Sequence, residues 1–496
     1  MRVRIPRFFM ATTATQQPTL QIETLSTGGC DPTEIYRRVA HGPSVLLDGA
    51  GWFDGRCALI GLLPFGAFQS RGASSEFHYF GLDIDHPAIW CDAGNPAAHL
   101  QGWLDRFSLP PISTADVPFS GGAIGFIAYE FAGQLEKRPG PPISDPNLFD
   151  LHLFFFDLVL LIDRATDQVQ IVFNPLPQMR MGKDAEAARR AGREKIDTVR
   201  QWLAETPGPL SPDVSVLSSG ASVRYDTTPA DYMAQVNRVL EYIAAGDVFQ
   251  VNLSHRLRVP AEKTAAFSVY QKLARINPSP FSAYCDMGKV QIACGSPERL
   301  VRLFQRGGQR FVETWPIAGT RPRGVTVAED NEMVAALHAS RKERAEHLML
   351  VDLARNDLGR VCRFGTVHVA SLMETEKYSH VIHLVSRVAG EAADGTTPLS
   401  AMAALFPGGT ITGVPKIRCM EIIAELEGQP RGIYTGAIGY IGFDGEMDFN
   451  IAIRTWVQRA GEMTARVGGG IVADSRPDAE YQETMQKAAA LIAALG

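Results

Sequence analysis

Two short acidic motifs contain the residues of this chain that could hold a metal ion. Glu343 and Glu346 lie in the first motif, and Glu480 and Glu483 lie in the second. Carboxylates three residues apart on a helix lie on one face, one turn from each other. Two such faces would together form an all-oxygen pocket, which suits Mg2+ better than zinc. On spacing alone, solvated helix faces paired with nearby lysines and arginines are the simpler interpretation.

Two glycine-rich segments, 407–416 and 468–475, could bind an anion. Glycines let backbone N–H groups approach a carboxylate closely, and a helix that begins after Pro415 would add its dipole. The first segment has the glycine spacing of a P-loop, but Val414 and Pro415 stand where a P-loop needs Lys and Ser or Thr. The segments therefore indicate either a carboxylate cradle or tight turns. Their candidate binding residues are Thr412, Gly413, Lys416, Gly469 and Gly470.

Three polar residues stand within apolar segments. Arg454 ends the alternating segment 447–454, on the face opposite Phe449, from which it could bind a carboxylate through two hydrogen bonds. His383 lies on a predicted strand, where a single histidine is more often a hydrogen-bonded structural residue than a catalyst. Glu298 follows a predicted strand at a proline turn, where it could be a general acid or an ordinary turn carboxylate. With a divalent cation, these groups suit a small polyanionic substrate that loses a hydroxyl.

Hydrophobic periodicity predicts the elements that must position these residues. Helical spacing predicts helices over 184–203, 229–245, 330–355, 415–427 and 477–494. Short apolar segments predict strands over 44–48, 57–61, 122–130 and 153–162, and alternation predicts strands over 247–258, 379–388 and 433–443. Gln250, Asn252 and Ser254 share one face of the strand 247–258. Asp444-Gly445 predicts a hairpin within 433–454. The interleaved elements predict an α/β (α+β) fold with mainly antiparallel sheets.

Composition limits the class of protein. The 496 residues are 45% hydrophobic and 21% charged, as in soluble globular proteins. The net charge of −6, without a block of like charge, argues against a nucleic-acid partner and favours a small molecule. The longest apolar stretch, 153–162, is half the roughly 20 residues that a membrane-spanning helix needs. Seven scattered cysteines without a CxxC pair indicate neither a disulfide framework nor a zinc ribbon, and they fit the cytoplasm.

Six segments resemble the motifs of the chorismate-utilising enzymes and follow each other in the same order. The family includes anthranilate synthase component I, aminodeoxychorismate synthase component I, isochorismate synthases and salicylate synthases. The similarity covers residues 230–496 and implies a single large body in which two mainly antiparallel sheets are sandwiched between helices. The segments are 316–324, 342–359, 380–386, 407–421, 431–454 and 468–484.

The resemblance and the composition together predict four regions. Residues 1–17 are expected to be a disordered tail, and residues 18–205 an N-terminal region that contributes strands to the sandwich. The Pro-, Ser- and Gly-rich residues 206–222 are expected to be a linker or surface loop. Residues 223–496 are expected to form the chorismate-binding catalytic region.

The resemblance also implies a role for each candidate residue. It places Mg2+ directly on Glu346 and Glu483, with Glu343 and Glu480 reaching it through water. One carboxylate of chorismate would bind the metal, and Glu298 would protonate the C4 hydroxyl as it leaves. His383 would flank the ring and take part in later elimination. The other carboxylate would lie near Tyr434, Arg454, Lys487, Gly469 and Gly470.

The resemblance also implies the identity of the nucleophile, through the residue at position 250, which is Gln250 in this chain. Family members that add water have a lysine base at this position, whereas members that use ammonia resemble this chain in having glutamine. Amination at C2 is therefore implied. No cysteine of this chain lies in the GxCxG setting of a glutaminase nucleophile, so the ammonia is expected to come from a separate glutamine amidotransferase subunit.

Two products remain open. Ala318 stands where enzymes that form 4-amino-4-deoxychorismate often have a lysine, and here it matches anthranilate synthases. The segment 44–48, SVLLD in place of the LLES of feedback-inhibited anthranilate synthases, favours 4-amino-4-deoxychorismate, as does GGTITG in 408–413. A non-catalytic subunit of the same fold is a third hypothesis. It predicts loss of metal or acid residues, whereas Glu298, Glu346, Glu483 and Arg454 are all present.

Overall fold

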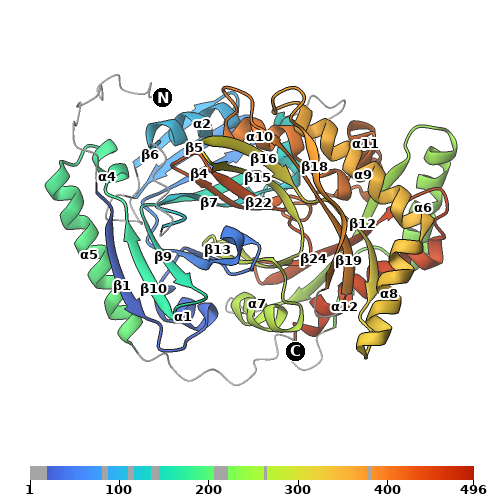
Figure 1. Ribbon diagram of the computed structural model, residues 1–496, viewed down its shortest axis with the longest axis horizontal. Helices are drawn as coiled ribbons and strands as arrows, with labels where there is room; N and C mark the ends of the chain where they lie inside the picture. Colours follow the sequence, from blue (N-terminus) through green and yellow to red (C-terminus); the bar gives the residue numbers. More distant parts are fainter. Residues whose placement is uncertain are drawn as a thin grey trace.

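Two twelve-stranded antiparallel sheets, A and B, form the centre of the molecule (Figure 1). The computed structural model describes residues 19–80, 88–109, 117–135, 145–205, 222–261, 265–377 and 381–496. The predicted tail and, apart from Ser222, the predicted linker lie outside these residues. Strands from both sides of the predicted linker pair within each sheet, so the two parts of the chain form one body.

The order of the strands brings distant segments together. Sheet A consists of β1 (Gln21–Ser26), β10 (Gln168–Phe173), β9 (Leu158–Asp163), β3 (Cys57–Gly61), β2 (Ser44–Leu47), β13 (Phe281–Asp286), β14 (Gln291–Ser296), β23 (Thr455–Arg459), β24 (Glu462–Ile471), β12 (Gln250–Pro260) and β11 (Arg224–Tyr225), with β20 (Gly413–Val414) beside β12. Sheet B consists of β17 (Ile317–Pro322), β19 (Val381–Glu391), β16 (Gln309–Thr314), β15 (Arg299–Arg306), β22 (Met447–Asn450), β21 (Ala437–Gly442), β7 (Gly122–Ile127), β8 (Leu151–Phe156), β4 (Gly66–Arg71), β5 (Ser74–Tyr79) and β6 (Ala88–Ala93), with β18 (His368–Lys377) beside β19.

Helices cover the outer faces of both sheets, which confirms the predicted sandwich (Figure 1). Apolar side chains of α1, α5, α7 and α12 pack on sheet A, and those of α2, α9 and α10 pack on sheet B. The helices are α1 (Pro32–Val39), α2 (Pro96–Arg106), α3 (Ala132–Leu135), α4 (Leu176–Arg180), α5 (Ala185–Ala204), α6 (Pro229–Ala244), α7 (Ala265–Ile276), α8 (Val327–Ala339), α9 (Arg341–Gly359), α10 (Pro398–Leu405), α11 (Lys416–Glu427) and α12 (Pro477–Ala493).

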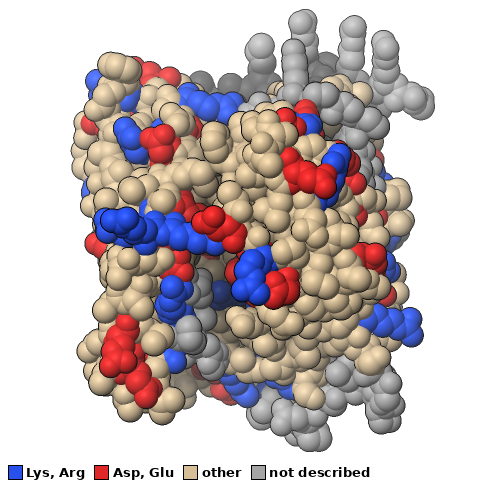
Figure 2. Space-filling view, turned by 90° about the vertical axis from the view of Figure 1, so that its right-hand side faces the viewer, with Lys and Arg blue, Asp and Glu red and all other residues tan. Residues whose placement is uncertain are grey.

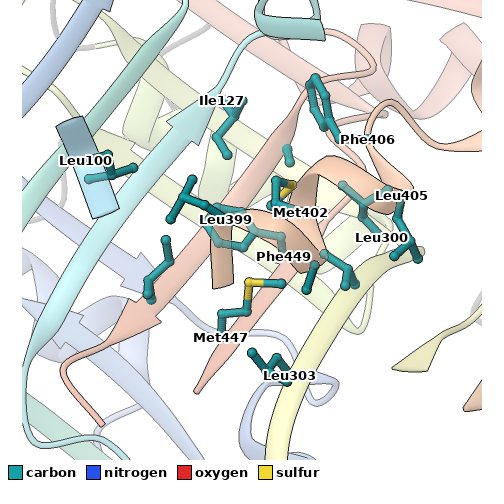
Figure 3. Packing of buried hydrophobic residues seen from close by; sticks show 14 of the residues in the cluster. Leu100, Ile127, Leu300, Leu303, Leu399, Met402, Leu405, Phe406, Met447 and Phe449 are labelled. Carbon is teal, nitrogen blue, oxygen red and sulfur yellow. The ribbon is translucent and has the colours of Figure 1, made fainter. Parts of the chain in front are cut away.

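The core on the outer face of sheet B fixes the strands next to the candidate site. Figure 3 shows Leu399, Met402 and Leu405 of α10 packed over Met447 and Phe449 of β22. All five are at most 6% exposed. Burying large apolar side chains in this way stabilises the fold by roughly 1.5–3 kcal/mol for each side chain. The cluster therefore holds β22, after which the chain reaches Arg454.

The helix predicted over 330–355 is wrong in one respect, because it is two helices. Ser340 has an extended backbone (φ −67°, ψ 109°), which ends α8 and begins α9. Its hydroxyl accepts a hydrogen bond from the backbone N–H of Glu343. Serine is a favoured N-cap because its hydroxyl satisfies an N–H group that the first turn leaves without a partner. Glu343 consequently lies in the first turn of α9, where the helix dipole favours a carboxylate.

The strand predicted over 153–162 is also two strands, and they belong to different sheets. The chain leaves β8 of sheet B and enters β9 of sheet A at Asp157, which is fully buried. The Asp157 carboxylate accepts hydrogen bonds from Lys195 Nζ at 2.6 Å and from Gln178 Nε2 at 2.5 Å. The acid that interrupts the apolar stretch thus marks the crossing between the sheets.

We expect Asp157→Ala to lower the free energy of unfolding by about 3–5 kcal/mol, because it leaves the half-buried ammonium of Lys195 without its counter-charge. Chemical denaturation followed by circular dichroism measures the change. Asp197→Ala is the matched control, since Asp197 forms an exposed pair with Arg200 on the same helix as Lys195. The control is expected to lose less than about 1 kcal/mol. Equal losses in both variants would contradict a stabilising role for the Asp157 pair.

Two further predictions concern disulfide bonds and membrane-spanning helices. All seven cysteines are free thiols, as their scattered positions predict. Within the described ranges, no helix combines the length and apolar character needed to cross a bilayer. The predicted location in the cytoplasm stays a prediction.

Candidate active site

The polar face of β12 lies beside two glycines of the neighbouring strand β24. Gln250, Asn252 and Ser254 alternate with buried apolar residues, as predicted, and all three are at most 8% exposed. Asn252 is paired across the ladder with Gly470, and Ser254 with Gly468. A Cβ on Gly470 would overlap the amide nitrogen of Gln250. Glycine at this position therefore makes room for the Gln250 side chain.

Helices α9 and α12 bring their acidic residues to this strand pair. Gln250 Nε2 donates to Glu346 Oε1 at 3.1 Å, which connects α9 to β12. A Cβ on Gly469 would lie 3.6 Å from an oxygen of Glu480 and 3.6 Å from an oxygen of Glu483, so α12 reaches β24 beside it. Carboxylates that are 134 residues apart or more in the chain thus converge, as the motifs predict for a shared site.

Like charges in this acidic cluster raise one another's pKa values. Burial raises the pKa of Glu346, and the negative charges of Glu483 and Glu480 add to the rise, against Lys342. Burial also raises the pKa of Glu480, and Glu483 contributes to that rise. This repulsion acts among carboxylates that the contacts at Gln250, Gly469 and Gly470 bring to the same strand pair. A divalent cation among them would relieve it.

The carboxylates also have protein partners that a metal ion would replace. Glu343 pairs with Arg321, Glu483 with Lys487 at 2.8 Å, and Glu480 accepts from Ser475 Oγ at 2.6 Å. In the described part of the chain, no group of three or more His, Cys, Asp or Glu side chains already surrounds a metal position. The hard oxygen donors still fit Mg2+, and buried Glu343 Oε2 accepts no hydrogen bond from a described residue.

Glu298 lies in the connection between β14 and β15 and is 5% exposed. Its Oε1 accepts from Thr410 Oγ1 at 2.8 Å. Burial raises the pKa of Glu298 to about 7, although Thr410, a backbone hydrogen bond from Ile317 and the charge of Arg454 act against the rise. The next residue, Arg299, is buried and binds Asp448 through two hydrogen bonds of 3.0 and 2.9 Å. Glu298 is thus a rigidly held acid that is partly protonated at neutral pH.

The pH dependence of turnover follows from this pKa. If protonated Glu298 is required for turnover, log kcat/KM is expected to be flat on the acid side of about 7 and to fall with a slope of −1 above it. The rate falls with rising pH because the carboxyl can donate a proton only below its pKa. Rates should be measured at a fixed concentration of the reactive form of any co-substrate whose own ionisation changes with pH. A profile without an alkaline limb would contradict the assignment.

His383 and Arg454 lie next to this acid. Arg454 Nη2 lies 3.4 Å from His383 Nε2, and His383 Nδ1 lies 3.4 Å from the carbonyl of Gly319. Because Arg454 can only donate, the ring proton of His383 is assigned to Nδ1. Burial, followed by the charge of Arg454, lowers the pKa of His383 to about 3, so the ring is neutral. Lys487 Nζ donates to the carbonyl of Gly468 at 3.0 Å and pairs with Glu483 at 2.8 Å, which places it beside β24.

The position of Arg454 differs from its predicted one. The predicted alternation stops at Asn450, where β22 ends, and Arg454 itself has φ +52°. This left-handed conformation is uncommon outside glycine and persists where surrounding contacts impose it. The guanidinium therefore reaches His383 because the strand is interrupted before Arg454. Strand alternation alone would not place it there.

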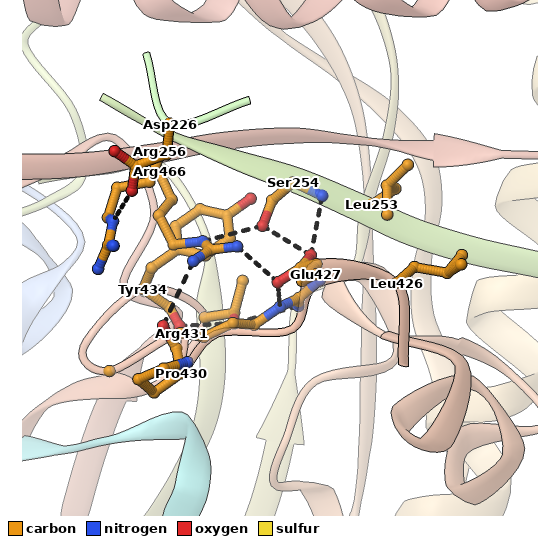
Figure 4. A network of polar contacts seen from close by, with 12 residues as sticks. Asp226, Leu253, Ser254, Arg256, Leu426, Glu427, Pro430, Arg431, Tyr434 and Arg466 are labelled. Carbon is orange, nitrogen blue, oxygen red and sulfur yellow. Dashed lines mark hydrogen bonds and ion pairs between the residues drawn. The ribbon is translucent and has the colours of Figure 1, made fainter. Parts of the chain in front are cut away.

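A buried polar network that the sequence analysis did not predict supports Tyr434. Figure 4 shows Glu427 at its centre, between Arg431, Arg466 and Ser254. Each arginine donates to Glu427 at 2.7 Å, and Ser254 Oγ donates at 2.8 Å. Burial alone would raise the pKa of Glu427, but the two guanidinium groups lower it. The i, i+4 spacing of Glu427 and Arg431 was the signal available in the sequence.

Tyr434 packs against this network. A Cβ on Gly468 would lie 2.9 Å from the Tyr434 hydroxyl, so the ring approaches β24 beside the other glycines. Burial raises the pKa of Tyr434 to about 12, which keeps the hydroxyl protonated and able to donate to an anion.

The glycine-rich segment 407–416 packs against β12. The Thr412 carbonyl accepts from Asn252 N at 2.8 Å, and the Thr412 hydroxyl donates to the Gly408 carbonyl at 2.8 Å. Gly413 has φ +133°, and a Cβ there would overlap the Gln250 carbonyl. Lys416 Nζ pairs with Asp357 at 3.0 Å. A direct role of these three residues in binding substrate stays a prediction.

The side of the molecule that carries α6 and α8 is hollowed (Figure 2). Lys and Arg side chains lie beside Asp and Glu side chains around the hollow. Mixed charge of this kind suits a small charged ligand better than a nucleic acid, whose binding surface is a continuous basic patch.

Known proteins share both the sequence and the fold. Residues 86–493 match the family described as chorismate binding enzyme. Aminodeoxychorismate synthase component 1 of Bacillus subtilis is 41% identical over 454 residues, which are 91% of each chain. Anthranilate synthase component 1 of Thermus thermophilus is 43% identical over 401 residues, covering 80% of this chain and 82% of that protein.

A solved structure agrees. The crystal structure of anthranilate synthase component I from Streptococcus pneumoniae TIGR4 superposes with a TM-score of 0.73 at 29% identity, covering 88% of this chain and 92% of that chain. The family match spans most of the chain and includes every candidate residue named above. The resemblance inferred from the motifs is thereby confirmed, and the chain belongs to the chorismate-binding enzyme family.

Proposed function

We propose that the protein catalyses the Mg2+-dependent amination of chorismate with ammonia to 4-amino-4-deoxychorismate, the precursor of p-aminobenzoate in the folate branch. The observation that carries the proposal is the position of Gln250. Its buried amide lies against Glu346 and over Gly470, where family members that add water have a lysine base. An amide cannot remove a proton from water. Ammonia needs no such base, because its lone pair is already available.

The other residues of the site have roles that fit this reaction. Glu298 would give its proton to the C4 hydroxyl, which leaves as water while the C2–N bond forms, and the resulting ammonium group would release a proton. This step gives the C2 amine. A second ammonia that attacks C4, while the C2 amine leaves as ammonia, would then give 4-amino-4-deoxychorismate. Tyr434, Arg454 and Lys487 would bind a substrate carboxylate with the amides of Gly469 and Gly470. The metal would be held by Glu346 and Glu483, with Glu343 and Glu480 in its outer shell. When bound, Mg2+ would supply positive charge for the other substrate carboxylate.

We further propose that a separate glutamine amidotransferase subunit supplies the ammonia. The relatives named above are called component 1 or I, which supports a second component. None of the seven cysteines lies in a GxCxG sequence. The isolated chain should therefore work with ammonium salts at elevated pH, and glutamine alone should not replace them.

Anthranilate synthesis is the second candidate, and Ala318 favours it. This residue pairs with Leu384, next to His383, and its methyl group cannot form the covalent adduct that a lysine would form. The first candidate is favoured by the segment 44–48, SVLLD, which stands where feedback-inhibited anthranilate synthases carry LLES.

A product assay decides between these candidates. The purified chain is incubated with chorismate, Mg2+ and ammonium chloride, and products are separated by liquid chromatography with mass detection. The proposal expects an aminated, non-aromatic product without release of pyruvate, which an added lyase converts to p-aminobenzoate. Blue-fluorescent anthranilate with an equal amount of pyruvate would establish the second candidate. The absence of any aminated product would overturn both.

Gln250→Lys tests the role of this residue in choosing the nucleophile. The new amine next to Glu346 could act as a base for water, so we expect isochorismate to form beside the aminated product when ammonium is limiting. The measurement is the ratio of the two products by chromatography. Gln250→Met is the control, because it has similar length and no base. An unchanged product ratio in Gln250→Lys would show that Gln250 does not face C2.

A further inference from the structure

Two buried amide oxygens on the inner face of β12 have no hydrogen-bond donor. Gln250 is 3% exposed and Asn252 is 8% exposed. Across the residues that the structure describes, nothing donates to Gln250 Oε1 or to Asn252 Oδ1. Buried acceptors are nearly always paired, because an unpaired one has lost its hydrogen bond to water. Two such atoms on one face of one strand point to a ligand that donates hydrogen bonds.

The orientation of each amide is set by its surroundings. Gln250 Nε2 donates to Glu346, which turns Oε1 away from the carboxylate. The Gln250 amide lies over Gly470, and Gly470 is the direct cross-strand partner of Asn252. The two side chains are therefore neighbours above the same glycine. Arg431, the cation that reaches Asn252, donates to its backbone carbonyl and not to its side chain.

We propose that Asn252 is a specificity-determining residue that, together with Gln250, holds the attacking ammonia. This inference rests on the proposed amination. Ammonia has three N–H donors and one lone pair. Two amide oxygens can accept two of the N–H groups and leave the lone pair free to attack C2. Neither oxygen can take a proton, so a water molecule held in the same way would remain a weak nucleophile.

The test compares the Michaelis constants for the two substrates. In Asn252→Ala, KM for free ammonia is expected to rise by about tenfold, the upper range for losing one hydrogen bond. KM for chorismate is expected to stay within twofold. Asn252→Asp keeps an acceptor at this position and should recover a substantial part of the affinity for ammonia. Asn331→Ala, on the exposed face of α8, is the matched control and should change neither constant.

Each outcome has a defined meaning. A rise in KM for chorismate equal to or larger than that for ammonia would overturn the proposal, because Asn252 would then bind a substrate hydroxyl or only maintain the fold. An unchanged KM for ammonia would also overturn it. If Asn252→Ala is not recovered as folded protein, Asn252→Ser provides the same comparison with a shorter polar side chain. Failure of the wild-type protein to aminate chorismate would instead refute the proposed function.

Discussion

Glu298→Gln is expected to lower kcat by about 10²- to 10⁴-fold, the usual contribution of a positioned general acid. The amide can still accept the hydrogen bond from Thr410 that Glu298 Oε1 accepts at 2.8 Å. It has nearly the same shape, so KM for chorismate should stay within a few-fold. What the amide cannot do is give a proton to the leaving hydroxyl. Steady-state rates with saturating ammonium, together with calorimetric titration of chorismate, measure the two effects separately.

The control for this variant is Glu332→Gln, an exposed carboxylate on α8, which should leave kcat unchanged. Residual activity in Glu298→Gln should also lack the alkaline limb near 7, because the group that titrates there is gone. Parallel losses of chorismate affinity and kcat would show that Glu298 holds the substrate. The acid would then have to be assigned to another group.

The residues of the site could be predicted because their chemistry is visible in short segments. The i, i+3 spacing of Glu343 with Glu346 survives in the structure because both belong to one helix, α9. The alternation in β12 likewise places Gln250 and Ser254 on one face. Local periodicity is a reliable guide where one element presents a residue, since the geometry of helix and strand then fixes its direction.

Positions that depend on contacts between distant segments could not be predicted. Apolar residues continue on both sides of Asp157, yet the chain changes sheets there, and the Asp157 carboxylate pairs with Lys195, 38 residues later. Alternation also gave no sign of the left-handed turn at Arg454. Lys416 Nζ pairs at 3.0 Å with Asp357, which lies 59 residues earlier in the chain. Each of these cases is decided by a partner that no local pattern contains.

Removal of the metal is expected to abolish turnover, because a Lewis-acid cation contributes several kcal/mol of charge stabilisation, or about 10²- to 10⁴-fold in rate. Glu346→Gln should have nearly the same effect in the presence of Mg2+. Glu346 is the carboxylate that connects α9 to the strands, and its pKa is raised by burial and by Glu483 and Glu480. Glu332→Gln, which changes an exposed carboxylate on α8, is the matched control here as well and should retain activity.

Thermal unfolding tests Mg2+ binding at the same site without a measurement of activity. Mg2+ at about 100 times its dissociation constant should stabilise the wild-type protein by about 2.7 kcal/mol and raise Tm accordingly. Without the metal, Glu346→Gln should be at least as stable as the wild type, because it removes a charge that Glu483 and Glu480 repel. With the metal, its Tm should no longer rise. These carboxylates belong to α9 and α12. If the Mg2+-dependent rise in Tm also occurs in Glu346→Gln, the ion binds away from these two helices. The proposed reaction would then lose its basis.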